Sequence, residues 1–203
     1  MKAKTAFCFD LDGTITKEEI LPLLAKKLDL FDEIQALTMA TINGFIPFES
    51  SFKLRTMILS QIPISQIQDI VVDVKLHHQI VEFIQQNREN CFIVTGNLDV
   101  WLEKLLSKLR IQAITSIAHY DKDRLIGVSK ILNKGDAINE IRQQGFDRII
   151  SVGDGMGDVN MFNQSNISIA YGGVHKPVQT LIELSDILTF KEESLCRTLN
   201  TLL

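Results

Sequence analysis

An unbroken apolar run near the start of the chain ends abruptly in two carboxylates and a glycine, in the segment Phe7-Cys8-Phe9-Asp10-Leu11-Asp12-Gly13-Thr14. Residues 6–9 are all apolar, which predicts a strand buried on both faces of a parallel sheet. The carboxyl ends of such strands form the usual ligand crevice of open α/β folds. Burying two carboxylates there is costly unless they bind metal or take part in chemistry. Asp10 and Asp12 are therefore predicted to belong to a functional site.

The next part of the chain has a helical pattern. Apolar residues at three- and four-residue spacing predict helices over 18–30, 32–43, 48–59 and 65–75. Gly44 and Pro47 separate two of them, and Ser65 is the expected N-cap of the last. No convincing strand pattern interrupts residues 16–76, so we interpret this stretch as a helical insertion after the first strand.

From residue 77 onward, helix and strand patterns alternate. Helices are predicted over 77–87, 99–109, 134–143, 157–164 and 176–184, and strands over 91–94, 113–118, 149–152, 167–170 and 187–189. Residues 120–127 (YDKDRLIG) predict a small hairpin with an exposed turn. Strands separated by helices of this length indicate βαβ units, hence an α/β fold with a doubly wound parallel sheet. The expected division is a core of 1–15 plus 77–203 and an inserted helical domain of 16–76.

Composition limits the classes of partner. The 203-residue chain has 45% hydrophobic and 23% charged residues, as is ordinary for a globular protein, and a net charge of −4, which does not favour nucleic acid or an anionic membrane. No segment approaches the ~20 apolar residues of a membrane span, and the first apolar run is shorter than the roughly 7–15 residues of a signal peptide core. Cys8, Cys91 and Cys196 are scattered and odd in number. We interpret them as reduced thiols of a cytoplasmic protein.

Three further motifs are expected at the same edge of the sheet. Thr95-Gly96-Asn97 follows the strand over 91–94, Lys134 opens a helix, and the loop 153–158 (GDGMGD) follows the strand over 149–152. Taken alone, Thr95 is equally typical of a helix N-cap, and Lys134 is typical of a solvated lysine. The glycine loop lacks the last glycine of a dinucleotide-binding motif because Asp158 occupies that position.

The order and setting of these four motifs resemble those of the haloacid dehalogenase superfamily of phosphohydrolases, and the resemblance covers essentially the whole chain. It implies a Rossmann-like core, identifies the insertion as that superfamily's small helical cap, and predicts a phosphatase that forms an aspartyl-phosphate on Asp10. In this scheme Asp12 is the general acid and base. Its pKa must then be raised from the ordinary value of about 3.9 towards the operating pH.

The resemblance also implies a magnesium site. Asp10, Asp154 and Asp158 would face a dianionic phosphate, and one lysine does not offset that repulsion. Hard oxygen ligands together with a substrate phosphate suit Mg²⁺. The family pattern assigns the metal to Asp10, the backbone carbonyl of Asp12, and Asp154, with Asp158 orienting the loop.

The remaining motif residues would bind the phosphoryl group. By the same resemblance, Thr95 and the backbone amide of Gly96 hold phosphoryl oxygens, because glycine allows the backbone to approach an anion closely. Lys134 neutralises the charge that develops on the transferring group.

The insertion is similar to that of phosphoserine phosphatases. Glu19 has the family's spacing after the nucleophile, and Phe48 and Arg55 fall on a matching pattern that starts at Gly44 (GFIPFESSFKLR). Arg55 would bind the carboxylate of a phosphorylated amino acid, Glu19 its ammonium group, and Phe48 would exclude water. Without this resemblance, both charged residues would be interpreted as solvated helix faces.

Three positions depart from the phosphoserine phosphatase pattern. Asn97 replaces a second glycine and would place its amide near the serine-binding pocket, Gly157 replaces an asparagine, and Ile42 replaces a methionine. Two alternatives to a phosphoserine phosphatase therefore stay open: a phosphatase of another small phosphorylated metabolite, and a catalytically inactive protein that binds a phosphorylated ligand. The presence of Asp12 favours an enzyme and disfavours the superfamily's ion pumps and dehalogenases, which lack an acid at this position.

Overall fold

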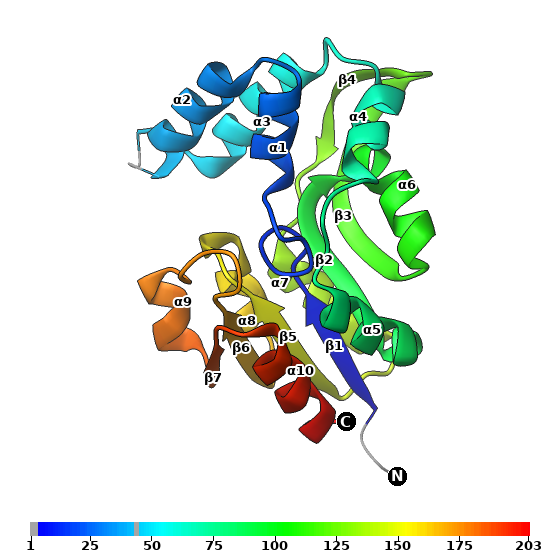
Figure 1. Cartoon of the computed structure of the whole chain (residues 1–203), viewed down its shortest axis with the longest axis vertical. Coiled ribbons are helices and arrows are strands. Elements are labelled where there is room, and N and C mark those ends of the chain that lie inside the picture. Colours follow the sequence, from blue (N-terminus) through cyan, green and yellow to red (C-terminus); the bar gives the residue numbers. More distant parts are fainter. Residues whose placement is uncertain (1–3, 43–44) are drawn as a thin grey trace.

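The computed structural model describes residues 4–42 and 45–203, and seven strands form one sheet in the order β4-β3-β2-β1-β5-β6-β7 (Figure 1). The strands are β1 (Thr5–Phe9), β2 (Cys91–Leu98), β3 (Gln112–Asp121), β4 (Arg124–Lys130), β5 (Arg148–Gly153), β6 (Ile167–Tyr171) and β7 (Ile187–Thr189). All neighbours pair in parallel except β3 and β4, which are antiparallel. The predicted α/β fold with a doubly wound parallel sheet is confirmed, and β1 lies at its centre.

The described helices follow the predicted pattern with shifted ends. They are α1 (Ile20–Lys27), α2 (Phe31–Ile42), α3 (Phe48–Leu59), α4 (Ile64–Val71), α5 (His78–Gln86), α6 (Asp99–Leu109), α7 (Lys134–Gln143), α8 (Val159–Asn163), α9 (Gln179–Leu184) and α10 (Glu192–Thr201). Short 3₁₀ turns cover Arg88–Asn90 and Met156–Asp158. The C-terminal helix α10 was missed by the sequence analysis, although it buries Leu195 and Leu199.

Alternation along the central strands divides the core into two layers. Phe7 and Phe9 of β1 face one side, where α5, α6 and α10 pack, and the shorter Ala6 and Cys8 face the other side, under α7, α8 and α9. Both faces of β1 are therefore buried, as its continuous apolar run predicts. Trp101 of α6 is fully buried in the first layer.

The expected hairpin is longer than predicted. The strand over 113–118 and the hairpin over 120–127 together form the single β3–β4 ribbon, whose turn reaches the start of α4. There the Asp123 carboxylate accepts hydrogen bonds from the backbone N–H (2.7 Å) and the hydroxyl (2.6 Å) of Ser65. The prediction that Ser65 is the N-cap of α4 is therefore wrong, because the helix begins earlier, at Ile64 after Pro63.

The inserted segment leaves and rejoins the core at one place. Thr16 and Leu76 form an antiparallel bridge, and the Lys17 N–H donates to the Lys75 carbonyl over 2.7 Å. From this neck, α1, α2 and α3 extend above the carboxyl edge of the sheet, whereas α4 lies beside α6 (Figure 1). Gly44 and the side chain of Ile42 lie outside the described part of the structure.

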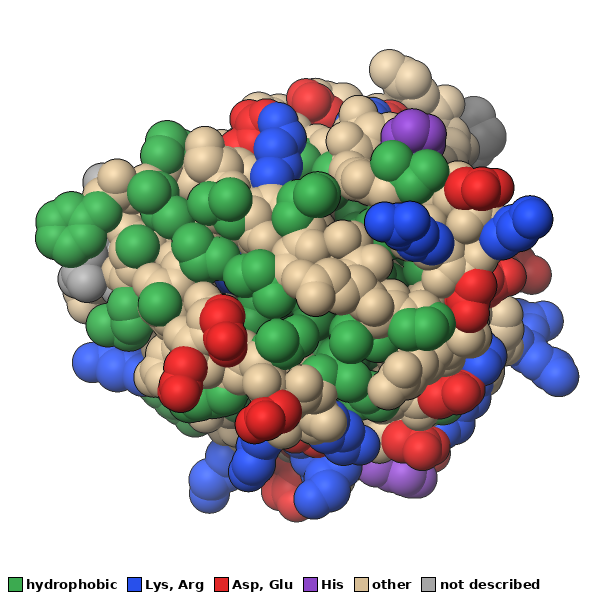
Figure 2. Space-filling model, turned by 90° about the horizontal axis from the view of Figure 1, so that it is seen from above, with side chains coloured by type: hydrophobic (Ala, Val, Ile, Leu, Met, Phe, Trp, Pro, Cys, Tyr) green, Lys and Arg blue, Asp and Glu red, His purple; other side chains and the backbone are tan. Residues whose placement is uncertain are grey.

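Seen from above, hydrophobic side chains gather on the surface of the insertion (Figure 2). Large apolar side chains exposed by more than a third on α2, α3 and the link between them are Phe31, Met39, Phe45, Phe48, Leu54 and Met57. Among the described residues, no helix combines the length and apolar character needed to cross a membrane. Cys8, Cys91 and Cys196 are free and buried.

Candidate active site

The first acidic motif is fixed where β1 ends. The backbone N–H of Asp10 donates to the Val152 carbonyl of β5 over 2.9 Å, so the Asp10 side chain lies at the carboxyl edge of the sheet. Gly13 follows with φ +68°, and a Cβ there would lie 2.6 Å from Oδ2 of Asp154. A side chain at this position is thus excluded twice, by backbone strain and by the close approach of the second acidic loop.

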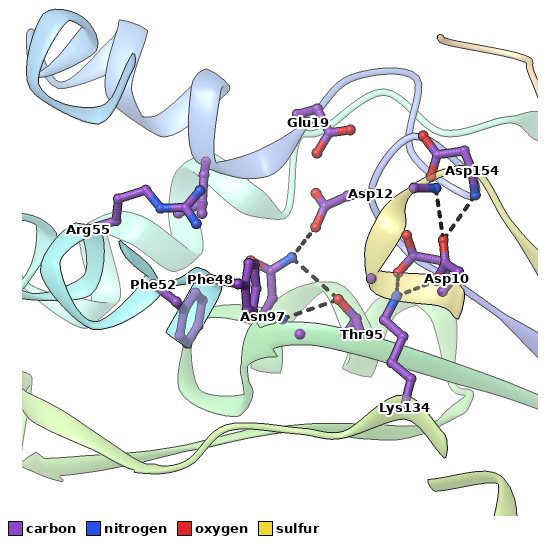
Figure 3. Close-up of a pocket in the computed structure, with 15 residues that line it drawn as sticks. Asp10, Asp12, Glu19, Phe48, Phe52, Arg55, Thr95, Asn97, Lys134 and Asp154 are labelled. Carbon is purple, nitrogen blue, oxygen red and sulfur yellow. Dashed lines mark hydrogen bonds and ion pairs between the residues drawn. The ribbon is translucent and has the colours of Figure 1, made fainter. Parts of the chain in front are cut away.

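Lys134 joins the two acidic motifs. Its Nζ lies 2.5 Å from Oδ1 of Asp10 and 2.7 Å from Oδ1 of Asp158, and its side chain is only 9% exposed (Figure 3). The lysine is placed by α7, whose N-cap Asn133 accepts a hydrogen bond from the N–H of Gly135. Burial by itself lowers the pKa of Lys134, but the two carboxylates outweigh it and hold the pKa above the ordinary value. The reading of Lys134 as a solvated lysine is therefore wrong.

Asp158 organises the second acidic loop. Its Oδ2 accepts hydrogen bonds from the backbone N–H groups of Asp154 (3.0 Å) and Gly155 (3.1 Å), while Oδ1 binds Lys134. A Cβ at Gly153 would collide with the Asp158 carboxyl group, so a glycine is needed there. Both oxygens of Asp158 are thus engaged within the protein, which fits an orienting role.

Three carboxylates converge beside Lys134. Oxygens of Asp10, Asp154 and Asp158 lie within 4.8 Å of one another. Burial, and next the charge of Asp158, raises the pKa of Asp10 well above its ordinary value and that of Asp154 to about 7. The cluster holds more negative charge than one lysine balances, and its donors are all hard oxygens. These residues therefore fit a divalent cation such as Mg²⁺.

Asp12 lies between the core and the insertion. Its Oδ1 accepts a hydrogen bond from the backbone N–H of Ile20 over 2.8 Å. Its Oδ2 accepts one from Nδ2 of Asn97 (Figure 3). Burial raises the pKa of Asp12, and these two hydrogen bonds only partly oppose the shift. The direction is the one that an acid–base residue requires.

The Thr95 motif lies within β2 rather than after it, because this strand continues to Leu98. Pairing with β3 becomes irregular between Thr95 and Leu98. Thr95 is 1% exposed, and its Oγ1 accepts a hydrogen bond from the Asn97 N–H over 3.2 Å. The N-cap of the following helix is Leu98, so Thr95 is not a helix cap. A Cβ at Gly96 would meet nothing within 4 Å, which shows that this backbone faces open space.

The insertion supplies the opposite wall of the pocket. Phe48 and Phe52 stack with ring centroids 5.9 Å apart, and Arg55, only 8% exposed, donates from Nε to the Ser51 carbonyl over 3.3 Å. Within the described residues Arg55 forms no ion pair with a carboxylate. Glu19 lines the same pocket, and burial, followed by Asp12 and Asp154, raises its pKa to about 8.

One pocket collects all the residues that the sequence analysis assigned to the site. Leu21 and Phe52 also line the pocket, and Nε2 of His175 lies 3.3 Å from Oε1 of Glu19; none of these three residues was predicted from the sequence. Phe52 stands one helical turn after Phe48, so helical spacing alone would have found it. No sequence motif marks His175, which reaches Glu19 from the segment between β6 and α9.

Comparisons with known proteins show the family to which this chain belongs. The chain is 25% identical to a phosphoserine phosphatase of Lactococcus lactis, over 95% of this chain and 96% of the relative, and 26% identical to one of Methanocaldococcus jannaschii, over 95% of both. A structure described as a substrate-bound phosphoserine phosphatase complex shares the fold, with a TM-score of 0.81, 22% identity, and 98% and 99% of the two chains covered. The family model for haloacid dehalogenase-like hydrolases matches residues 7–163. The chain belongs to this family.

Proposed function

We propose that the protein is a Mg²⁺-dependent phosphatase that converts L-phosphoserine to L-serine and phosphate through an aspartyl-phosphate on Asp10. The observation that carries the phosphatase chemistry is the buried Lys134, shared between Asp10 and Asp158 next to Asp154. A buried cation among three convergent carboxylates at a sheet edge has no packing role that an apolar side chain would not fill better. It suits a site for an anion that is attacked by a carboxylate.

In the first chemical step, one oxygen of Asp10 forms a bond to phosphorus as the bond between phosphorus and the serine oxygen breaks. Asp12 gives its proton to that leaving oxygen, which becomes the serine hydroxyl. The Thr95 hydroxyl and the Gly96 N–H hold phosphoryl oxygens, and Lys134 balances the charge that develops there. The charge of Lys134 also lowers the pKa of Asp10 and so opposes part of the rise that burial and Asp158 cause.

In the second step, Asp12, now a carboxylate, takes a proton from a water molecule. The water oxygen forms a bond to phosphorus, and the bond between phosphorus and Asp10 breaks. The products are inorganic phosphate and the original Asp10 carboxylate, with Asp12 protonated again. One residue thus serves as acid and then as base.

Asp10, Asp154 and the backbone carbonyl of Asp12 would hold the metal. Bound there, Mg²⁺ would supply the positive charge that Lys134 alone does not provide against the phosphate and the carboxylates. Asp158 keeps its orienting role, because both of its oxygens already accept hydrogen bonds.

The insertion would select the substrate. Buried Arg55, with no carboxylate partner among the described residues, suits the substrate carboxylate, and Glu19 suits the ammonium group. Phe48, which lines the pocket although half of it is exposed, would cover the apolar part. On this basis residues 16–76 form a cap domain over a core of 1–15 and 77–203, and three free thiols support a cytoplasmic location.

One observation favours a second candidate, a phosphatase of another small phosphorylated metabolite. Asn97 stands where phosphoserine phosphatases usually have a glycine. Its larger side chain lines the pocket and narrows it between the core and the insertion. A catalytically inactive binding protein is disfavoured, because Asp12, the proposed acid–base group, is present.

Replacing the nucleophile tests the proposed chemistry. We expect Asp10→Asn to abolish phosphate release, whereas Asp73→Asn, at an exposed carboxylate outside the site, retains it. Excess EDTA should stop wild-type turnover, and added Mg²⁺ should restore it. An Asp10→Asn protein that keeps its rate, or turnover that ignores EDTA, would exclude the mechanism.

A further inference from the structure

Asn97 is a buried polar residue, and β-sheet pairing does not explain why a polar side chain stands at this position. It follows Thr95 and Gly96 in the irregular last part of β2, is 4% exposed, and lines the pocket. A buried side-chain amide needs hydrogen-bond partners, because a buried donor or acceptor left without a partner destabilises the folded protein. The partners of Asn97 therefore show what the residue does.

Both recorded partners of the Asn97 amide belong to the catalytic machinery. Its Nδ2 donates to Oδ2 of Asp12 and lies 3.4 Å from Oγ1 of Thr95, and Figure 3 shows the amide between these two groups. The Asn97 N–H also donates to Oγ1 of Thr95 over 3.2 Å. The residue thus connects the acid–base group of the first motif to the phosphoryl-binding hydroxyl of the second.

The other hydrogen bond to Asp12 comes from the insertion. Oδ1 of Asp12 is held by the N–H of Ile20, the first residue of α1. Asn97, on β2, therefore holds one oxygen of Asp12 from the core, and Ile20 holds the other from the insertion. A carboxyl group fixed at both oxygens has little freedom to rotate away from the leaving group.

We propose that Asn97 is a positioning residue that aims the Asp12 carboxyl group for proton transfer, an inference that rests on the proposed phosphatase function. Each oxygen of Asp12 keeps one lone pair after accepting its hydrogen bond. One of these lone pairs carries the proton that passes to the leaving oxygen as the bond to phosphorus breaks. In the second step the same position receives the proton from water. Asn97 exchanges no proton and forms no covalent bond.

A series of aryl phosphates that differ only in the leaving group tests this role. Dinitrophenolate leaves readily without a proton, whereas phenolate depends strongly on the general acid. The variants are Asn97→Ala, Asn97→Leu, which keeps about the same size but lacks the amide donor, and Asp12→Ala as the reference for lost acid catalysis. Asn163→Ala, at an exposed asparagine of α8 outside the pocket, is the matched control.

We expect both Asn97 variants to lose roughly tenfold or more in kcat/KM on phenyl phosphate, part of the ~10²–10⁴ that general acid–base catalysis contributes. On dinitrophenyl phosphate they should stay within about threefold of wild type, because that ester does not need the proton. The plot of log kcat/KM against leaving-group pKa therefore becomes steeper, as for Asp12→Ala. Asn163→Ala keeps the wild-type slope.

Two results would overturn the inference. An equal loss across the series would mean that Asn97 only shapes the pocket, and a loss confined to L-phosphoserine would mean that it contacts the amino acid.

A measurement that needs no turnover provides an independent test. The ¹⁵N–¹H signals of the Asn97 side-chain amide should shift in Asp12→Asn but not in Asn163→Ala, and unchanged signals in Asp12→Asn would also contradict the proposal. A wild-type protein inactive on every ester would instead refute the proposed function.

Discussion

At the residue scale, the buried carboxyl group of Asp154 lowers the stability of the folded protein at neutral pH. Asp10 and Asp158 share the Lys134 ammonium group, but Lys134 forms no ion pair with Asp154. Burial and the neighbouring Asp158 raise the pKa of Asp154 to about 7. A carboxyl group whose pKa is higher in the folded than in the unfolded state binds more protons when folded. Stability therefore falls as the pH rises from about 4, the unfolded pKa, to about 7.

Asp154→Asn should accordingly stabilise the protein in EDTA. We expect its melting temperature to exceed that of wild type by a few degrees at pH 7.5, since about 1 kcal/mol corresponds to roughly 2–4 °C for a chain of this size. The difference should shrink as the pH falls from about 7 to 4, and Mg²⁺ should no longer raise the melting temperature of the variant. Thermal unfolding with and without Mg²⁺ measures both effects. A variant less stable than wild type in EDTA would contradict the described charge balance.

Arg55 is the residue on which amino-acid recognition depends. Arg55→Ala should lower kcat/KM for L-phosphoserine by about 10–100-fold, because a hydrogen bond to a charged group contributes about 1.5–3 kcal/mol. Phenyl phosphate, which has no carboxylate, should react as with wild type. Lys53→Ala, on the same helix but exposed, is the control and should leave both substrates unaffected. Equal losses on the two esters would show that Arg55 supports the fold rather than the substrate.

At the element scale, Glu192 ties the C-terminal helix α10 to the start of α5. Its Oε2 lies 3.1 Å from Nδ1 of His77, and its Oε1 accepts the Gln79 N–H over 2.5 Å. Burial pushes the pKa of Glu192 up, but the hydrogen bonds from His77 and Gln79 outweigh it, so the pKa lies below its ordinary value. The carboxylate therefore contributes stability that is present above the unfolded pKa of about 4.3 and is lost as the pH falls through the folded pKa.

Glu192→Gln should lower the free energy of unfolding at pH 7 by about 1.5–3 kcal/mol, the usual contribution of a hydrogen bond to a charged group. Urea unfolding at pH 7 and at pH 4 tests the prediction, and the gap between variant and wild type should narrow at the lower pH. Glu193→Gln, at the next residue of α10, is the control. A gap that widens towards pH 4 would contradict the sign of the shift.

The elements that the sequence predicted well are those whose patterns are strong locally. The apolar runs of β1, β2 and β5 each end in a motif, and parallel strands bring their carboxyl ends to one edge, so the meeting of Asp10, Thr95 and Asp154 follows from order alone. Helix α10 was missed although Leu195 and Leu199 have the i, i+4 spacing of a helix, because the segment is short and mostly polar. The Ser65 contact with Asp123 joins segments far apart in the chain, which local capping rules do not cover.

At the scale of the whole molecule, the site depends on the insertion lying over the sheet edge. The neck at Thr16 and Leu76 carries both chain connections, so the pocket walls come from two parts of the chain that meet only when it is folded. Because of this arrangement, the spacing of Glu19 and Arg55 in the sequence identified them as candidate site residues but did not predict how far their side chains are buried. The arrangement also explains why the contact of His175 with Glu19, between the core and the insertion, carries no signal in the sequence.

The most direct test of the account is Mg²⁺-dependent phosphate release from L-phosphoserine, compared by kcat/KM with a panel of small phosphomonoesters. We expect L-phosphoserine to reach at least ~10⁴ M⁻¹s⁻¹, the lower end of the usual range for efficient enzymes, and to exceed every other ester clearly. Asp10→Asn should be silent on the whole panel. A higher kcat/KM on another ester, with little on L-phosphoserine, would contradict the substrate while leaving the phosphatase chemistry intact.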